Sequence, residues 1–169
     1  MNTTLKFHLD WLAARPDFSL ANFEGVNFEQ GDFSKICLAG ANLKNANLFR
    51  VNFTGANLED AMVQAAGMLD AKCRWLKGSR ADFSGCDMRL GDYRGANFRG
   101  ANFSGANLQG SNFRWADFRL AWLNGANFYG ADLTGVKMRG AHCNRADFRS
   151  AKMPKKELMA GADMEGALL

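Results

Sequence analysis

Phenylalanine recurs in this chain at a fixed interval of five residues. Of the 14 Phe residues, twelve occupy positions whose number leaves a remainder of three on division by five. They are Phe18, Phe23, Phe28, Phe33, Phe53, Phe83, Phe98, Phe103, Phe113, Phe118, Phe128 and Phe148. Because self-similarity at a fixed period is the sequence signature of repeat architectures, this interval constrains the fold more than any other feature of the chain.

The other positions follow the same period. The repeat runs without a change of phase from residue 16 to residue 155, which makes 28 units of five residues. In each unit, here called a pentad, the first residue is usually Ala and the second Asn or Asp. The third is usually Phe, Leu or Met, and the fourth is polar. The fifth is Gly twelve times, as in Gly95 and Gly100.

A period of five fits neither an α-helix nor a regular β-strand. The apolar first and third positions lie two residues apart, so they point to the same side of an extended segment. Gly together with Asn or Asp favours a turn in every pentad. A chain that turns inward every five residues forms a coil, and backbone pairing stacks successive coils about 4.8 Å apart. The pattern therefore predicts a solenoid whose narrow interior is filled by the Ala and Phe positions.

The pentads Ala96–Gly100, Ala101–Gly105 and Ala131–Gly135 resemble those of pentapeptide repeat proteins, and the resemblance covers residues 16–155. It implies an all-β fold, a right-handed quadrilateral β-helix with four pentads, or 20 residues, in each coil. Twenty-eight pentads would then give about seven coils and a rod roughly 34 Å long.

Segments outside the repeat are expected to cover the ends of the rod, since open coils expose unpaired backbone there. Residues 1–15 are predicted to form a short N-terminal capping helix that starts at Thr3 or Thr4 and stops before Pro16. Residues 156–169 are interpreted as a C-terminal cap or a dimerisation tail. The phase shifts by one residue within Lys155–Gly161, and the pattern resumes at Ala162.

The repeat is weakest over Ala61–Arg80. Gly78 stands where a core Phe is expected, and the usual Asn or Asp is replaced by Met62, Gly67, Lys72 and Lys77. Because the phase survives, we expect a bulge or a distorted face here rather than a domain boundary.

Residues 20 apart should stack in columns on the surface. One column contains Arg74, Arg94 and Arg114, and a second contains Arg99, Arg119 and Arg139. Trp75 and Trp115 lie beside the first column, about 10 Å apart with Gly95 between them. We interpret the two columns as a candidate partner-binding surface along one edge of the rod, because Arg and Trp are enriched at binding hot spots. The alternative is a solvated face on which Asp92, Asp117 and Asp132 pair with the arginines.

A secondary apolar face is predicted from a column of fourth positions. It contains Phe49, Leu69 and Tyr129, with Leu90 nearby. Such a column indicates contact with a partner, although exposed apolar side chains are ordinary when they are isolated.

The sequence gives little support for catalysis. His142 and Cys143 are neighbours, but they should point to opposite sides of the wall, and the carboxylates are spread singly. The four cysteines lack metal-ligand spacing, so we expect no enzyme, no cofactor and no metal. Buried, reduced thiols and the lack of a signal peptide or membrane span favour a cytoplasmic protein without a membrane partner.

These observations favour a non-enzymatic scaffold that binds an unidentified protein partner and could form a homodimer through its C-terminal end. The family resemblance implies an alternative, which is interaction with a type II topoisomerase such as DNA gyrase and protection from quinolones or toxins by DNA mimicry. The net charge of +4 departs from such mimicry. Direct nucleic-acid binding by the arginines is a third interpretation, although this charge is too small to imply it alone.

Overall fold

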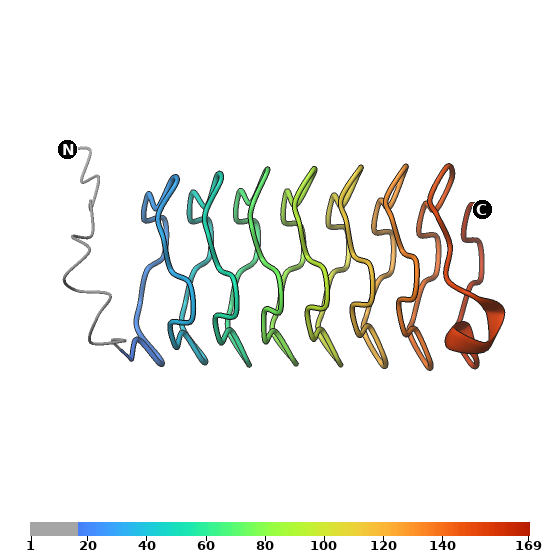
Figure 1. The fold of residues 1–169 in the computed structure, drawn as a ribbon, viewed down its shortest axis with the longest axis horizontal. Coiled ribbons are helices and arrows are strands. Elements are labelled where there is room, and N and C mark those ends of the chain that lie inside the picture. The colour runs from blue at the N-terminus through green and yellow to red at the C-terminus, as the bar shows by residue number, and fades with distance from the viewer. Residues whose placement is uncertain (1–16) are drawn as a thin grey trace.

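The computed structural model describes residues 17–169 as a rod of stacked coils, with residue 17 at one end and the C-terminus at the other (Figure 1). The N-terminal capping helix predicted for residues 1–15 lies outside the described residues. Between residues 17 and 169 the one helical element is η1, a 3-10 helix at Lys156–Met159.

Parallel β-bridges hold neighbouring coils together. They join second-position residues that are 20 apart, from Asp17–Cys37 at one end to Asp132–Lys152 near the other. Each pentad contributes a single bridging residue, so a coil contains four pentads with four flat faces. We name these faces by one coil: face A carries Lys77, face B Asp82, face C Asp87 and face D Asp92, and residues 20 apart share a face.

The fourth and fifth residues of each pentad form the corners between faces. In a representative turn, the Ala96 N–H donates to the Tyr93 carbonyl at 3.1 Å. The fifth residue has a positive φ, 67° at Gly95 and 57° at Trp75, as the third residue of a type II turn requires. The second-position side chain supports the turn, because the Asn97 Oδ1 accepts a bond from the Arg99 N–H at 3.1 Å.

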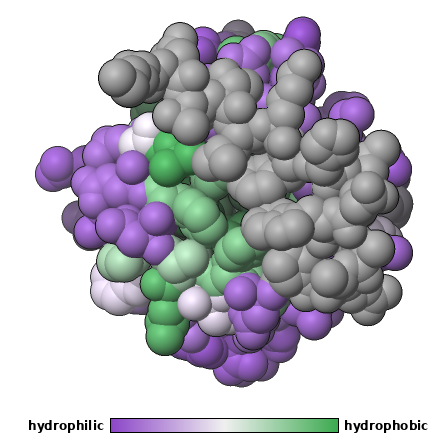
Figure 2. Space-filling model, turned by 90° about the vertical axis from the view of Figure 1, so that its left-hand side faces the viewer, coloured by the Kyte–Doolittle hydropathy of each residue, from purple (hydrophilic) through white to green (hydrophobic). Residues whose placement is uncertain are grey.

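The interior of the rod is filled by the first and third residues of the pentads. Aromatic rings of successive coils stack along the axis, with centroids 5.3 Å apart for Phe98 and Phe118 and 5.0 Å apart for Phe83 and Phe103. Where this end of the rod is visible in Figure 2, hydrophobic residues lie towards the middle and hydrophilic residues make up most of the rim. Rings at these separations stabilise the core beyond the apolar area that they bury.

The expectation of a bulge over Ala61–Arg80 is wrong. Lys77 bridges to both Asn57 and Asn97, and the Gly78 N–H donates to the Asn97 carbonyl at 2.8 Å, so the register continues through this stretch. The missing Phe is compensated by the ring of Phe98, which would lie 3.0 Å from a Cβ atom at Gly78. The columns predicted on the surface therefore keep their alignment.

The chain leaves the 20-residue interval near its C-terminus. His142 bridges to Asp163 and Asp147 to Leu168, each 21 residues on, which confirms the predicted shift of phase by one residue. The Met138 N–H donates to the carbonyl of Leu158, a residue of η1, at 2.7 Å. Residues 156–169 therefore stack on the preceding coil, and their role as a cap or a dimerisation tail stays a prediction.

Candidate protein-binding surface at the Trp75–Trp115 corner

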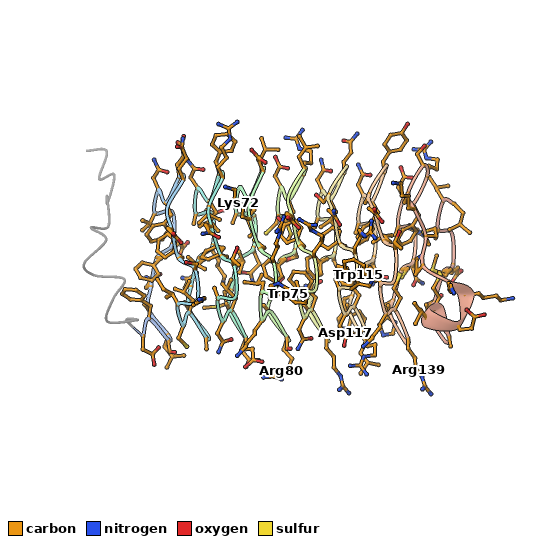
Figure 3. The ribbon with its side chains drawn as sticks, viewed as in Figure 1. Lys72, Trp75, Arg80, Trp115, Asp117 and Arg139 are labelled. Atoms are coloured by element: carbon orange, nitrogen blue, oxygen red, sulfur yellow. The ribbon has the colours of Figure 1, made fainter. Side chains whose placement is uncertain are left out.

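Trp75 and Trp115 lie at the corner between faces D and A, and 64% and 56% of their respective surfaces are exposed. Each indole extends over the glycine of the next coil. A Cβ atom at Gly95 would collide with the ring of Trp75, and one at Gly135 would lie 2.6 Å from Cδ1 of Trp115. The two rings thus lie against bare backbone along the middle of the rod in the view of Figure 3.

The arginines beside the tryptophans are held in place by carboxylates of face D. Asp92 accepts from the Arg74 Nε at 2.6 Å and from an Arg94 terminal nitrogen at 2.8 Å. The Arg114 guanidinium stands 4.6 Å from the centroid of the Trp115 ring, in a cation–π arrangement, and 4.0 Å from the Asp132 carboxylate. This column is therefore partly neutralised and fixed in position.

The second arginine column lies elsewhere than expected. Arg99, Arg119 and Arg139 are fourth residues of face A, so they occupy the corner between faces A and B. In Figure 3, Arg139 lies along the lower edge of the rod while Trp75 and Trp115 lie along its middle, with Asp117 between. The two columns therefore flank face A, and the prediction that they border a single edge is wrong.

Members of this second column differ in their pairing. Partial burial would raise the pKa of Asp117, but hydrogen bonds from the Arg119 side chain and backbone lower it below its usual value. For Arg99 and Arg139, residues 17–169 provide no carboxylate within 4.0 Å. The expectation that aspartates pair with the arginines thus holds for part of the set.

Charge is distributed unevenly around the rod. Over residues 17–155, the pentads of faces A and D contain 13 Lys and Arg against 7 Asp and Glu, whereas those of faces B and C contain 5 Lys and Arg against 6 Asp and Glu. The small net charge of the chain therefore conceals a basic side, and the Trp75–Trp115 corner lies at its centre.

The predicted apolar face is only partly assembled. Leu69, Leu90 and Tyr129 line a shallow hollow of about 370 Å³ whose floor includes Gly110 and Gly130. Phe49 does not line this hollow, and the Arg50 guanidinium lies 4.8 Å above its ring. The glycines that open the hollow were visible in the sequence as two fifth positions 20 apart.

Sequence reasoning missed an aromatic pair on face B. Trp122 is 48% exposed and stacks on His142 with ring centroids 4.2 Å apart. Both replace the usual Asn or Asp at second positions 20 apart, which was the available signal. Cys143 is fully buried and burial raises the pKa of its thiol to about 12, so His142 and Cys143 do not form a nucleophile pair.

Within the described part of the chain, no three His, Cys, Asp or Glu side chains gather in a way that could hold a metal ion. The same residues include no helix with the length and apolar character needed to cross a membrane.

Two family models for pentapeptide repeats match the chain. The model that consists of nine repeat copies matches residues 93–137. The model that consists of eight copies matches residues 32–61 and 126–155. The chain belongs to the pentapeptide repeat family. A search of curated proteins found no match.

Solved structures of pentapeptide repeat proteins share this fold, a right-handed β-helix. HetL from the cyanobacterium Nostoc sp. strain PCC 7120, involved in regulation of heterocyst differentiation, aligns with a TM-score of 0.53 at 21% identity over 90% of this chain and 80% of HetL. Full-length QnrB1, a plasmid-mediated fluoroquinolone resistance protein, aligns with a TM-score of 0.53 at 19% identity over 89% of this chain and 84% of QnrB1. The pentapeptide repeat protein alr5209 of Nostoc PCC 7120 aligns with a TM-score of 0.51 at 32% identity over 60% of this chain and 83% of alr5209.

Proposed function

We propose that this pentapeptide repeat protein is a non-enzymatic scaffold that binds another protein through the Trp75–Trp115 corner. One observation carries the proposal, namely two tryptophans, each more than half exposed, at corner positions of the same column. Their backbones have φ values of 57° and 60°, and for L-residues this left-handed conformation is unfavourable by about 1–2 kcal/mol. Glycine avoids that penalty and occupies the position one coil after each tryptophan, at Gly95 and Gly135.

The surroundings of the corner support the proposal. Each indole lies against a continuous hydrogen-bonded wall, and Asp92 fixes both Arg74 and Arg94. A partner would therefore meet side chains that lose little freedom on binding, which favours affinity. Trp and Arg are also the residues on which binding energy concentrates at protein interfaces.

The test is a double substitution, Trp75→Gly with Trp115→Gly. Because glycine suits the left-handed corner, the variant should fold at least as stably as the wild type. Wild type and variant would be compared in nuclease-treated pull-downs from the host lysate, followed by titration with the recovered partner. Leu120→Gly is the matched control, since Leu120 is half exposed at another corner with a φ of 60°.

We expect the partner to be lost with the tryptophan variant and retained with the control. Equal recovery with both variants would exclude this corner as the binding site. Recovery of nucleic acid alone, abolished by nuclease, would instead indicate a phosphate-binding surface.

Interaction with a type II topoisomerase is the second candidate, and the fold shared with QnrB1 favours it. The basic side formed by faces A and D argues against mimicry of DNA, which is a polyanion. A supercoiling assay with purified DNA gyrase and a fluoroquinolone separates the two candidates. Protection of supercoiling at micromolar protein would support this second candidate, and unchanged inhibition would remove it.

A further inference from the structure

Lysine replaces the usual Asn or Asp at four second positions, and all four lie on the two faces that meet at the Trp75–Trp115 corner. Lys72 and Lys152 belong to face D, and Lys77 and Lys137 to face A. A lysine side chain cannot accept the hydrogen bond that Asn or Asp receives from the N–H of the fourth residue. Each replacement therefore removes local support from a turn and adds a cation to the surface.

The lysines nearest the corner make no ion pair with any described residue, and the aspartates bridged to Lys72 and Lys137 in the neighbouring coils, Asp92 and Asp117, are bound by arginines. Lys72 precedes Trp75 by three residues on one face, and Lys77 follows it by two on the other, so they lie on the two faces that meet at this corner. Both are exposed, as is Lys137, and none of these three has a carboxylate within 4.0 Å among residues 17–169. Asp92, the carboxylate of face D in the next coil, is already shared by Arg74 and Arg94.

We infer that the partner is an acidic polypeptide segment that lies along the rod, with carboxylates on Lys72, Lys77 and Lys137 and an apolar side chain on Trp75. The inference rests on the proposed function and names the chemistry of its partner. Lys77 and Lys137 are three coils apart, about 14 Å, which an extended partner strand spans in about four residues. Alternate side chains of such a strand point to the same side, so two carboxylates could reach this column.

The aspartates on this side favour a polypeptide over a nucleic acid. Asp92 and Asp132 alternate with the arginines of face D, and Asp117 lies between Lys77 and Lys137 in the face A column. A phosphate backbone carries charge at every nucleotide and would meet these carboxylates along with the cations. A polypeptide can place its carboxylates opposite the lysines alone.

The test uses random 16-residue peptides displayed on phage and selected on the immobilised full chain. Enriched peptides would be synthesised and titrated against wild type and against Lys72→Asn/Lys77→Asn/Lys137→Asn. Because Asn restores the usual turn acceptor, this triple variant should melt no lower than wild type. Lys44→Asn, at the corner between faces B and C, is the control for loss of a cation elsewhere. A 20-base-pair DNA duplex is titrated in parallel.

We expect the selected peptides to be enriched in Asp and Glu. Their affinity for the triple variant should be at least about tenfold lower than for wild type, and their affinity for the control should be unchanged. Affinity should also fall as salt rises, because exposed pairs are screened. Peptides that require Trp75 and Trp115 but show no acidic enrichment, or bind the triple variant equally, would overturn this inference and leave the proposed function standing.

Other outcomes would overturn more than the chemistry of the partner segment. Peptides that bind Trp75→Gly/Trp115→Gly as well as wild type, or a selection that enriches nothing, would overturn the proposed function together with the inference. Tighter binding of the duplex than of any selected peptide, lost in the triple variant, would replace the acidic polypeptide by a nucleic acid.

Discussion

The indole of Trp75 lies on the backbone of Gly95, one coil further along the rod. The same relationship joins Trp115 to Gly135, Leu90 to Gly110 and Leu120 to Gly140. A large residue at a corner therefore extends towards the C-terminal end and covers a glycine 20 residues on. The corner glycines thus serve two purposes, a left-handed turn and a space for the preceding side chain.

Gly95→Ala should destabilise the protein more than Gly85→Ala. Both glycines have left-handed backbones, with φ values of 67° and 66°, so both substitutions should cost about 1–2 kcal/mol. Only Gly95 is covered, since a Cβ atom at Gly85 would meet nothing within 4 Å. We expect an excess of up to about 1 kcal/mol at Gly95, because the exposed indole is able to swing away. Chemical denaturation measures the difference, which should vanish in a Trp75→Gly background.

Tyr93→Phe should raise the free energy of unfolding. The Tyr93 hydroxyl is buried and, within the described residues, has no hydrogen-bond partner. Burial also raises the pKa of this phenol well above its usual value. An unpaired buried hydroxyl costs about 1–3 kcal/mol, so its removal should increase stability by about 1 kcal/mol. Phe113→Tyr, on the ring that stacks 4.8 Å from Tyr93, is the opposite control and should melt lower. A lower melting temperature for Tyr93→Phe would contradict the prediction.

Acid should destabilise the rod below about pH 4. A hydrogen bond from the Arg149 side chain lowers the pKa of Asp147, and Arg80 does the same for Asp60. Carboxyls with a lowered folded-state pKa contribute stability above their unfolded pKa and lose it as the pH falls through the folded value. Thermal melts from pH 2 to pH 8 should show a plateau above about pH 5. Asp147→Asn keeps the turn acceptor and removes the charge, so its acid limb should be shallower than that of wild type.

Cys37 should be the one cysteine that reacts with iodoacetamide in the native protein. Cys73, Cys86 and Cys143 are buried, and burial raises the pKa of the Cys86 and Cys143 thiols to about 12. The reactive species is the thiolate, which is scarce at such values near neutral pH. Mass spectrometry after brief alkylation should find a single label, and four after unfolding in denaturant. Rapid native labelling of Cys86 would indicate that the coils open locally.

The fold was predictable because every pentad repeats the same local sequence pattern, in which two apolar positions are followed by a turn. The site was predictable only in part, since the period gives the column of a residue but does not show where the corners fall. Arg119 therefore proved to lie one corner away from Trp115. The bulge predicted around Gly78 was wrong because the space left by the missing side chain is filled by Phe98, a residue of the next coil. Trp122 and His142 were missed because the columns were compared at fourth and fifth positions, whereas these two residues are second positions.

The bridging interval of 20 residues divides the rod into coils of equal length. Deleting residues 76–95 would bring the two corner tryptophans one coil closer and leave every face aligned. Deleting a single pentad instead would turn everything downstream by a quarter of a revolution, and each basic column would continue as that of a neighbouring face. Length in this molecule is therefore adjustable only in whole coils, and a partner that reads both tryptophans constrains how many coils separate them.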